Sequence, residues 1–525
     1  MLATWMAGCA WSIPVALSPP SGPVGPPRGE APTRLTSPVR RALSTDEGHD
    51  GPVFQVDLDH SAGKASAFVI ATNRNHVEEH FPRGSEKLVR LRELHPDWGQ
   101  RKMMLRIGHG PTDGRFDHAG MTGYHFEACW NRRGPYPYDD VRYSLEDARE
   151  LGAEMLHVVN YGTSTPDEAA RLVRYLNDPG CPERRVHPIE IPPTRYFEIG
   201  NEISWSMVRG HAEHAPDEVT YARRAREFIR AMRAASPVPI QIGVVASTNS
   251  NWLGDGWSGR DVTVRRMLGI LGDEVDFLVY HGYPSWPLKR DHDLATVMAQ
   301  NTWNHQLLSD VIGPAIRQAT SHPVAIANTE FFTEQYDSPR VARGMFGTLY
   351  AADTVALAFR HGMPIANQFC LDHGDMADAS YFLGDDPDRV TPIFRFQRLL
   401  AHHWGEDLLP VTVRRVPSVE VRGTDTRVQM PELEAVASRG DDDVLHVMLI
   451  HRTEGAARTV RLTGLPVGPA TATVLAGSAG WGSGPEDVRE TVSSWSPDRP
   501  LVLPPASITF IDLPDPCQEL PEAGT

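Results

Sequence analysis

The chain has 525 residues and a mass of 58.1 kDa, which is enough to bury a large core and to form two structural units. Its formal net charge of −16 argues against nucleic acid and anionic membrane surfaces as partners, because both attract basic patches. A neutral or cationic partner fits better, and sugars are neutral. Five cysteines are scattered without a C-x-x-C pair, so the sequence shows neither a zinc-ribbon pattern nor a disulfide framework.

Residues 1–50 differ in texture from the rest of the chain. The first 18 residues carry no charge and precede a Pro- and Gly-rich stretch, which resembles the apolar region of a signal peptide without the usual basic start. Two interpretations stay open. A signal peptide would make the protein secreted, whereas a disordered leader or a misassigned start would leave it cytoplasmic. Elsewhere the sequence has no apolar run long enough to span a bilayer.

Short apolar runs rich in Val and Ile alternate with longer amphipathic stretches from residue 67 to about 405. The runs predicted as buried parallel strands are 67–72, 103–108, 154–160, 195–200, 238–247, 275–282, 324–330 and 364–369. The helical patterns between them include 139–152, 165–178, 217–235 and 301–320. Eight such strands predict an α/β fold, a (β/α)₈ TIM barrel over 67–405. The alternative, a doubly wound sheet, would more often have a Gly-rich turn after its first strand, and ATNRNH at 71–76 is not one.

The texture changes again after the barrel. Residues 406–515 alternate apolar and polar residues, are rich in Val and Thr, and are broken by Gly and Pro, which predicts an antiparallel β-sandwich domain. GPVFQVDLD at 51–59 has the same texture, so we expect residues 51–66 to supply a strand to that sandwich. Residues 516–525 are read as a tail.

Polar side chains stand at the ends of the predicted barrel strands, where barrel enzymes place their reactive groups. RYFEIGNE ends the fourth strand with Asn201 and Glu202, and VAIANTE ends the seventh with Glu330. The other candidates at this rim are Arg106, His109, Asn160, His281, Tyr283, Trp286 and Gln368. Strands four and seven face each other across a barrel mouth, so Glu202 and Glu330 are expected to flank one bond.

Two carboxylates on either side of a bond are what retaining glycoside hydrolysis requires. One attacks the anomeric carbon and the other protonates the leaving oxygen, so their environments must differ. Arg106 and Tyr283 are candidates to keep Glu330 ionised. Asn201 could bind a sugar hydroxyl, and His281 could set the protonation of Glu202. Glu198, four residues before Glu202, is expected to face the barrel interior or to form a salt bridge.

These two strand ends resemble the catalytic strands of clan A glycoside hydrolases. VVNYGTSTPDEAARLVRYLND followed by RYFEIGNE is most similar to the α-L-arabinofuranosidases of glycoside hydrolase family 51, which also carry a β-sandwich after the barrel. The resemblance covers roughly residues 52–515. It implies that Glu202 is the acid/base, Glu330 the nucleophile, and Asn201 the hydroxyl ligand.

The sequence departs from that family in two segments. Family 51 has a substrate-binding Glu in its first barrel loop, where this chain reads TNRNH at 72–76. It also has RYPGGN after strand two, where this chain reads RIGHG at 106–110, a stretch that resembles the β-xylosidases of family 39.

The sequence thus predicts a retaining exo-glycosidase with a carbohydrate substrate and no cofactor or metal, most similar to an α-L-arabinofuranosidase. A β-xylosidase-like or endo-acting enzyme of the clan is the alternative. An alternative of another class is a non-catalytic carbohydrate-binding barrel. Homo-oligomerisation stays open.

Overall fold

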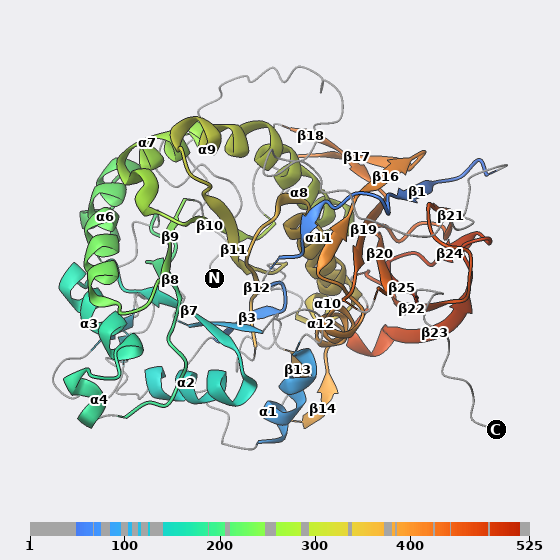
Figure 1. The fold of residues 1–525 in the computed structure, drawn as a ribbon. Helices are drawn as coiled ribbons and strands as arrows, with labels where there is room; N and C mark the ends of the chain where they lie inside the picture. Colours follow the sequence, from blue (N-terminus) through green and yellow to red (C-terminus); the bar gives the residue numbers. More distant parts are fainter. Residues whose placement is uncertain are drawn as a thin grey trace.

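The computed structural model describes residues 49–66, 68–74, 85–95, 103–107, 114–116, 124–126, 140–186, 188–204, 210–246, 259–284, 293–333, 339–371, 381–383, 386–423, 426–441, 443–480 and 483–514. Two units lie side by side, a barrel ringed by helices and a stack of mainly antiparallel sheets (Figure 1). The view in Figure 1 looks along the barrel, with the sheets of the second unit at the right.

The barrel is a closed sheet of parallel strands. In the described part of the chain its members are β3 (Ala71–Arg74), β4 (Met104–Ile107), β7 (Glu154–Val159), β8 (Tyr196–Ile199), β9 (Gln241–Val245), β10 (Phe277–Gly282), β11 (Ala325–Phe331) and β12 (Ala366–Gln368). Each one overlaps a predicted run, so the predicted TIM barrel is confirmed. The first strand begins four residues later than predicted, because Phe68 makes only an isolated bridge to Ile365 before regular pairing starts.

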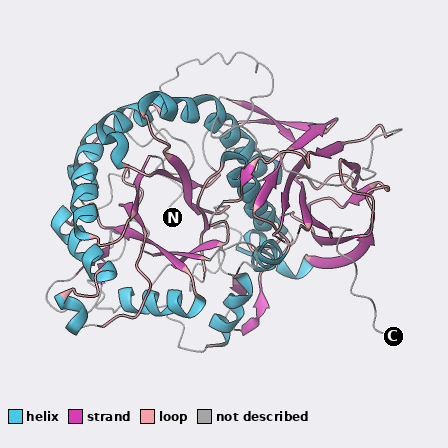
Figure 2. Cartoon of the chain, viewed as in Figure 1, coloured by secondary structure: helices cyan, strands magenta, loops and turns pink. Residues whose placement is uncertain are grey.

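Helices surround the barrel strands (Figure 2). The larger ones are α2 (Asp140–Leu151), α3 (Pro166–Asn177), α6 (Glu218–Ala235), α7 (Arg260–Leu271), α8 (Leu294–Leu307), α9 (Gly313–Ala319), α11 (Met345–His361) and α12 (Pro392–His402). The shorter ones are α1 (Glu86–Leu91), α4 (Pro182–Val186), α5 (His211–His214), α10 (Pro339–Ala342), and the turns η2 (Arg92–Leu94), η3 (Gly272–Glu274), η4 (Leu308–Ile312) and η6 (Pro485–Asp487).

Capping residues explain where these helices start. Thr165 and Glu168 form a reciprocal capping box at the start of α3, with Pro166 in the first turn. For the helix predicted over 301–320, the predicted first residue is wrong. Asp293 caps the backbone N–H of Thr296 and begins α8 seven residues earlier. The predicted segment then passes through the π-helical turn η4 before α9, which has Pro in its first turn.

The second unit contains a seven-stranded and a four-stranded sheet. The seven-stranded sheet has the order β2 (Gly63–Lys64), β15 (Asp407–Leu409), β19 (Leu433–Arg439), β20 (Leu445–His451), β25 (Ser507–Leu513), β22 (Ala470–Ala476), β23 (Arg489–Trp495). The four-stranded sheet has the order β16 (Val411–Arg414), β1 (Val53–Val56), β21 (Arg458–Thr463), β24 (Leu501–Leu503). The N-terminal β1 pairs antiparallel with β16 and parallel with β21.

Three two-stranded ribbons complete the described strands. They are β5 (Gly114–Phe116) with β6 (Tyr124–Phe126), β13 (Phe382–Leu383) with β14 (Asp386–Val390), and β17 (Ser418–Arg422) with β18 (Arg427–Pro431).

Strand β20 shows how the two units share a core. All seven of its residues are buried, although an antiparallel strand with one solvated face would alternate. Val447 and Leu449 pack between the two sheets, while Met448 and Ile450 belong to the large cluster that contains the barrel core. The seven-stranded sheet is therefore covered on both faces, by the smaller sheet and by barrel helices such as α11. None of the helices among the described residues is long and apolar enough to cross a membrane.

Candidate active site

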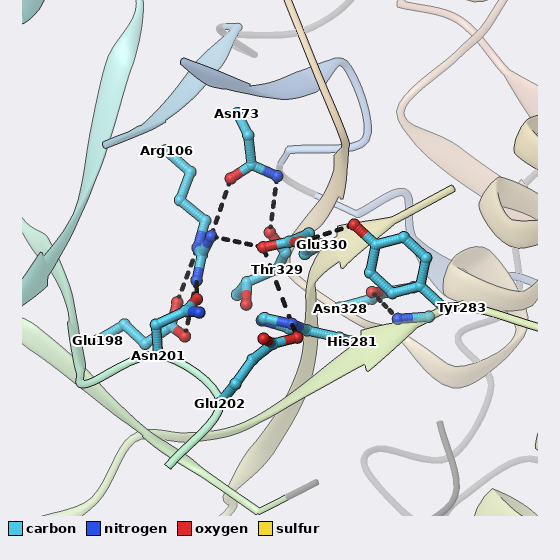
Figure 3. A network of polar contacts seen from close by, with 11 residues as sticks. Asn73, Arg106, Glu198, Asn201, Glu202, His281, Tyr283, Asn328, Thr329 and Glu330 are labelled. Atoms are coloured by element: carbon cyan, nitrogen blue, oxygen red, sulfur yellow. Dashed lines mark hydrogen bonds and ion pairs between the residues drawn. The ribbon is translucent and has the colours of Figure 1, made fainter. Parts of the chain in front are cut away.

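The fourth barrel strand ends in a turn that positions Asn201 and Glu202. Gly200 has φ +76°, and a Cβ there would lie 2.1 Å from Cδ1 of Ile203, so the chain needs glycine at this position. Glu202 itself has φ +48°, which is costly for a residue with a side chain. The turn holds Glu202 in this conformation with its carboxylate at the carboxyl end of the barrel (Figure 3).

Glu202 and Glu330 approach each other across the barrel mouth, with His281 beside both. His281 Nδ1 lies 3.0 Å from Glu202 Oε1 and 3.8 Å from Glu330 Oε2. One oxygen of each carboxylate and one ring nitrogen of His281 all lie within 4.8 Å of one another. The carboxylate side chains are 8% and 9% exposed, so each is open to a ligand only through a small part of its surface. The sequence prediction that the two glutamates meet across the barrel is confirmed.

Arg106 of β4 lies under this pair and binds four side chains. Its Nε and Nη2 donate to the two oxygens of Glu198 at 3.0 and 3.1 Å. Its Nη1 donates to Asn73 Oδ1 at 3.0 Å and to Glu330 Oε2 at 3.1 Å, and Nη2 also donates to Asn201 Oδ1 at 2.7 Å. A guanidinium has five N–H donors, so every donor of Arg106 is used. The side chain is fully buried and fixed in one orientation.

Tyr283 completes the surroundings of Glu330. Its hydroxyl donates to Glu330 Oε1 at 2.6 Å, on the carboxylate oxygen that Arg106 does not contact. Between His281 and Tyr283, the backbone N–H of Gly282 donates to Asn328 Oδ1 at 3.1 Å. A Cβ on Gly282 would lie 2.4 Å from Nδ2 of Asn328, so glycine lets β10 and β11 approach closely here.

The charges of the cluster shift the pKa of its two cationic groups. Burial lowers the pKa of Arg106, but Glu198 and Glu330 outweigh it and the net shift is upward. Burial likewise lowers the pKa of His281, and the charge of Glu330 with the hydrogen bond to Glu202 raises it above its ordinary value. Arg106 is therefore always charged, and the raised pKa of His281 favours a proton on its ring next to Glu202.

The other predicted site residues make different contacts or fall outside the described residues. Asn160 uses both ends of its amide on Thr163, donating to Oγ1 and accepting from the backbone N–H, both at 2.9 Å, so it shapes the turn after β7. Gln368 is fully buried in β12 and donates to the carbonyl of Phe369 at 3.2 Å. His109 and Trp286 fall outside the described residues.

Asn73 belongs to the cluster but was not predicted. It donates to the carbonyl of Thr329 at 3.3 Å while it accepts from Arg106, and so links β3 to β4 and β11. The available signal was a polar residue at the end of the first strand, the same signal that identified Arg106.

The trio Glu202, His281 and Glu330 offers ligand atoms close enough together to contact one cation. Its chemistry does not favour one, because Arg106 Nη1 already donates to Glu330 Oε2. A cation bound to that oxygen would meet a fixed positive charge about one hydrogen bond away. We assign no metal to this cluster.

Comparisons with known proteins agree with this architecture. The structure of the thermostable GH51 α-L-arabinofuranosidase from Thermotoga petrophila RKU-1 superimposes with a TM-score of 0.66 at 19% identity, over 88% of this chain and 99% of that one. AbfB, a family 51 α-L-arabinofuranosidase from Bifidobacterium longum, gives a TM-score of 0.70 at 15% identity over the same shares. The chain has the fold of the family 51 arabinofuranosidases.

Sequence comparison gives a shorter match. An intracellular exo-α-(1→5)-L-arabinofuranosidase from Halalkalibacterium halodurans is 30% identical over 175 residues. The match covers 32% of this chain and 32% of that curated relative. No protein-family model matches the chain.

Proposed function

We propose that the protein is a retaining glycoside hydrolase of the α-L-arabinofuranosidase type, with Glu330 as nucleophile and Glu202 as acid/base. The observation that carries this proposal is the approach of the two carboxylates, because one oxygen of Glu202 lies within 4.8 Å of one oxygen of Glu330. Retaining enzymes hold their carboxyl groups about 5–5.5 Å apart, whereas inverting enzymes leave room for a water at about 6.5–9.5 Å.

The contacts of the two glutamates differ in the way that this mechanism needs. Glu330 accepts one hydrogen bond from the permanently charged Arg106 and another from Tyr283, and both stabilise its ionised form. Glu202 contacts His281, a group that can gain or lose a proton. Glu330 is therefore suited to attack a carbon, and Glu202 to exchange a proton.

In the first step, a Glu330 oxygen forms a bond to the anomeric carbon as the bond to the leaving oxygen breaks. The proton of Glu202 passes to that leaving oxygen. In the second step, Glu202 takes a proton from water, and the water oxygen displaces Glu330 from the anomeric carbon. The sugar leaves with the configuration that it had in the substrate.

The arabinofuranoside preference rests on the family 51 fold and on the partial sequence match. A side-by-side assay of 4-nitrophenyl α-L-arabinofuranoside and 4-nitrophenyl β-D-xyloside tests it. We expect turnover of the arabinofuranoside with the larger kcat/KM. Turnover of the xyloside alone would replace the substrate assignment by the β-xylosidase-like alternative, and turnover only of a polysaccharide by the endo-acting one.

Azide rescue tests the two roles independently of the sugar. Azide should restore activity to Glu330→Gly with a glycosyl azide of inverted configuration, and to Glu202→Ala with one of retained configuration. A folded wild-type protein that binds sugar but turns over no glycoside would support the non-catalytic carbohydrate-binding barrel. An active wild-type enzyme whose two variants both resist rescue would contradict the role assignment.

A further inference from the structure

Glu198 is a buried charge that the two-carboxylate mechanism does not use. It lies on β8 four residues before Glu202, its side chain has no exposed surface, and its partner Arg106 has none either. Charged residues are rarely fully buried, and the desolvation of an ion pair is costly enough that apolar replacements are often as stable. Packing alone therefore does not explain a third glutamate, fully buried and paired with Arg106, next to the two proposed catalytic glutamates.

The geometry of Arg106 supplies that reason. Glu198 binds Nε and Nη2 in a bidentate arrangement, which sets the plane and the direction of the guanidinium. The N–H groups that remain then point at Asn73, Asn201 and Glu330, as Figure 3 shows. Without Glu198, the same guanidinium could rotate about its last torsions and lose its alignment with the Glu330 carboxylate.

Charge gives Glu198 a second effect on the same group. Arg106 is shared between Glu198 on one edge and Glu330 on the other, so the negative charge of Glu198 partly cancels the positive potential at Glu330. An uncompensated arginine at 3.1 Å would stabilise the Glu330 carboxylate strongly, and a more stable carboxylate is a weaker nucleophile. The charge of Glu198 thus limits how strongly Arg106 stabilises the Glu330 carboxylate, and so keeps Glu330 a stronger nucleophile.

We propose that Glu198 is a positioning residue that aligns Arg106 and, through it, sets the charge balance of Glu330. The inference rests on the proposed glycosidase function, because it assigns Glu198 a part in preparing the nucleophile. It requires no contact between Glu198 and the substrate. The residue acts only through Arg106.

Two variants of Glu198 differ in charge. Glu198→Gln keeps the side-chain length but removes the charge and one of the two acceptor oxygens, whereas Glu198→Asp keeps the charge and both oxygens on a shorter side chain. Removing the charge should move the acidic limb of the kcat/KM–pH profile to lower pH, because Glu330 would then face Arg106 without the opposing charge of Glu198. It should also lower kcat about tenfold or more. Glu198→Asp should lower kcat with a much smaller shift of the limb.

Glu190→Gln is the matched control, since its side chain is 89% exposed and paired only loosely with Arg149 at 3.8 Å. Thermal unfolding of each variant checks that it is folded. A uniform fall in activity at every pH, with both limbs unmoved in Glu198→Gln, would overturn the proposal and leave Glu198 a structural residue. Unchanged kinetics in both variants would overturn it as well.

A direct titration separates this inference from the proposed function. In protein labelled with ¹³C at the glutamate carboxyl carbons, the resonance of Glu330 is assigned by its loss in Glu330→Gln. Its midpoint should fall in Glu198→Gln, since the positive charge of Arg106 is then no longer balanced by Glu198. A midpoint that does not move contradicts the inference even if wild-type turnover is normal. A midpoint that does move in a protein without turnover upholds the charge balance and contradicts the glycosidase function.

Discussion

At the scale of single residues, the site is organised around Arg106, whose N–H groups all donate hydrogen bonds. The five N–H groups of Arg106 meet four side chains from β3, β8, the turn after β8 and β11. These side chains come from strands that are far apart in the sequence. Arg106 can therefore make all five hydrogen bonds only when the strands of the barrel mouth are in place. Tyr283 adds an independent donor to the second oxygen of Glu330.

Tyr283→Phe tests that second donor. Hydrogen bonds to a charged group contribute about 1.5–3 kcal/mol, so losing this one should lower kcat/KM by ~10–100-fold. The ionised form of Glu330 becomes less stable, so the acidic limb of the profile should move to higher pH, opposite in sign to the shift expected for Glu198→Gln. The measurement is kcat/KM on an aryl glycoside from pH 4 to 9. Tyr175→Phe on the outer helix α3 is the control and should leave the profile in place.

At the scale of elements, the turns after the strands place these residues, and this is where sequence reasoning was strongest. Apolar runs predicted all the barrel strands, and a polar residue at a strand end identified Arg106, Asn201, His281, Tyr283 and the two glutamates. Asn73 was not predicted because its contacts with other strands depend on barrel closure. Closure brings β3 beside both β4 and β12. No local pattern reports a contact to Thr329, which is 256 residues away.

Gly200→Ala tests the turn that carries Asn201 and Glu202. An alanine at φ +76° is strained and its Cβ would meet Ile203, so we expect a loss of about 1–2 kcal/mol in the free energy of unfolding. Displacement of Glu202 should lower kcat at least tenfold. Gly269→Ala in α7 is the control, because no atom lies within 4 Å of its new Cβ and alanine stabilises a helix. Denaturant unfolding and kcat together test both, and an unaffected kcat in Gly200→Ala would contradict the role of the turn.

At the scale of the whole molecule, the barrel and the seven-stranded sheet share one core. Met448, Ile450 and Phe510 belong to the same buried cluster as the barrel strands. Buried charges also cross the boundary. Arg452, which follows β20, donates from Nε to Asp353 of α11 at 2.8 Å and from Nη2 to Glu434 of β19 at 3.0 Å. The two units should therefore unfold together.

Arg452→Met tests this coupling. The change leaves Asp353 without its arginine in a fully buried position, and breaking a buried pair costs about 3–5 kcal/mol. We expect one unfolding transition in the wild type, with tryptophan fluorescence and far-UV circular dichroism coincident, and a large fall in its midpoint in the variant. Arg230→Met removes an exposed pair with Glu274 and should hardly move the midpoint. Two separate transitions in the wild type would contradict a shared core.

The stability of the whole molecule should also fall in acid, because two histidines are buried without charge. Burial lowers the pKa of His157 to about 4 and that of His361 to about 3, against 6.5 for an ordinary histidine. Between pH 6.5 and those values the unfolded chain binds more protons than the folded one, so the free energy of unfolding decreases as the pH falls through this window. Each of the two histidines should lower the free energy of unfolding by about 2 kcal/mol between pH 7 and pH 5. Urea unfolding at pH 7, 6 and 5 measures the decrease. His157→Asn and His361→Asn should each reduce the decrease in the free energy of unfolding. The control His402→Asn, at an exposed position, should not. If the free energy of unfolding falls equally with pH in the wild type and all three variants, groups other than these histidines control the loss of stability in acid.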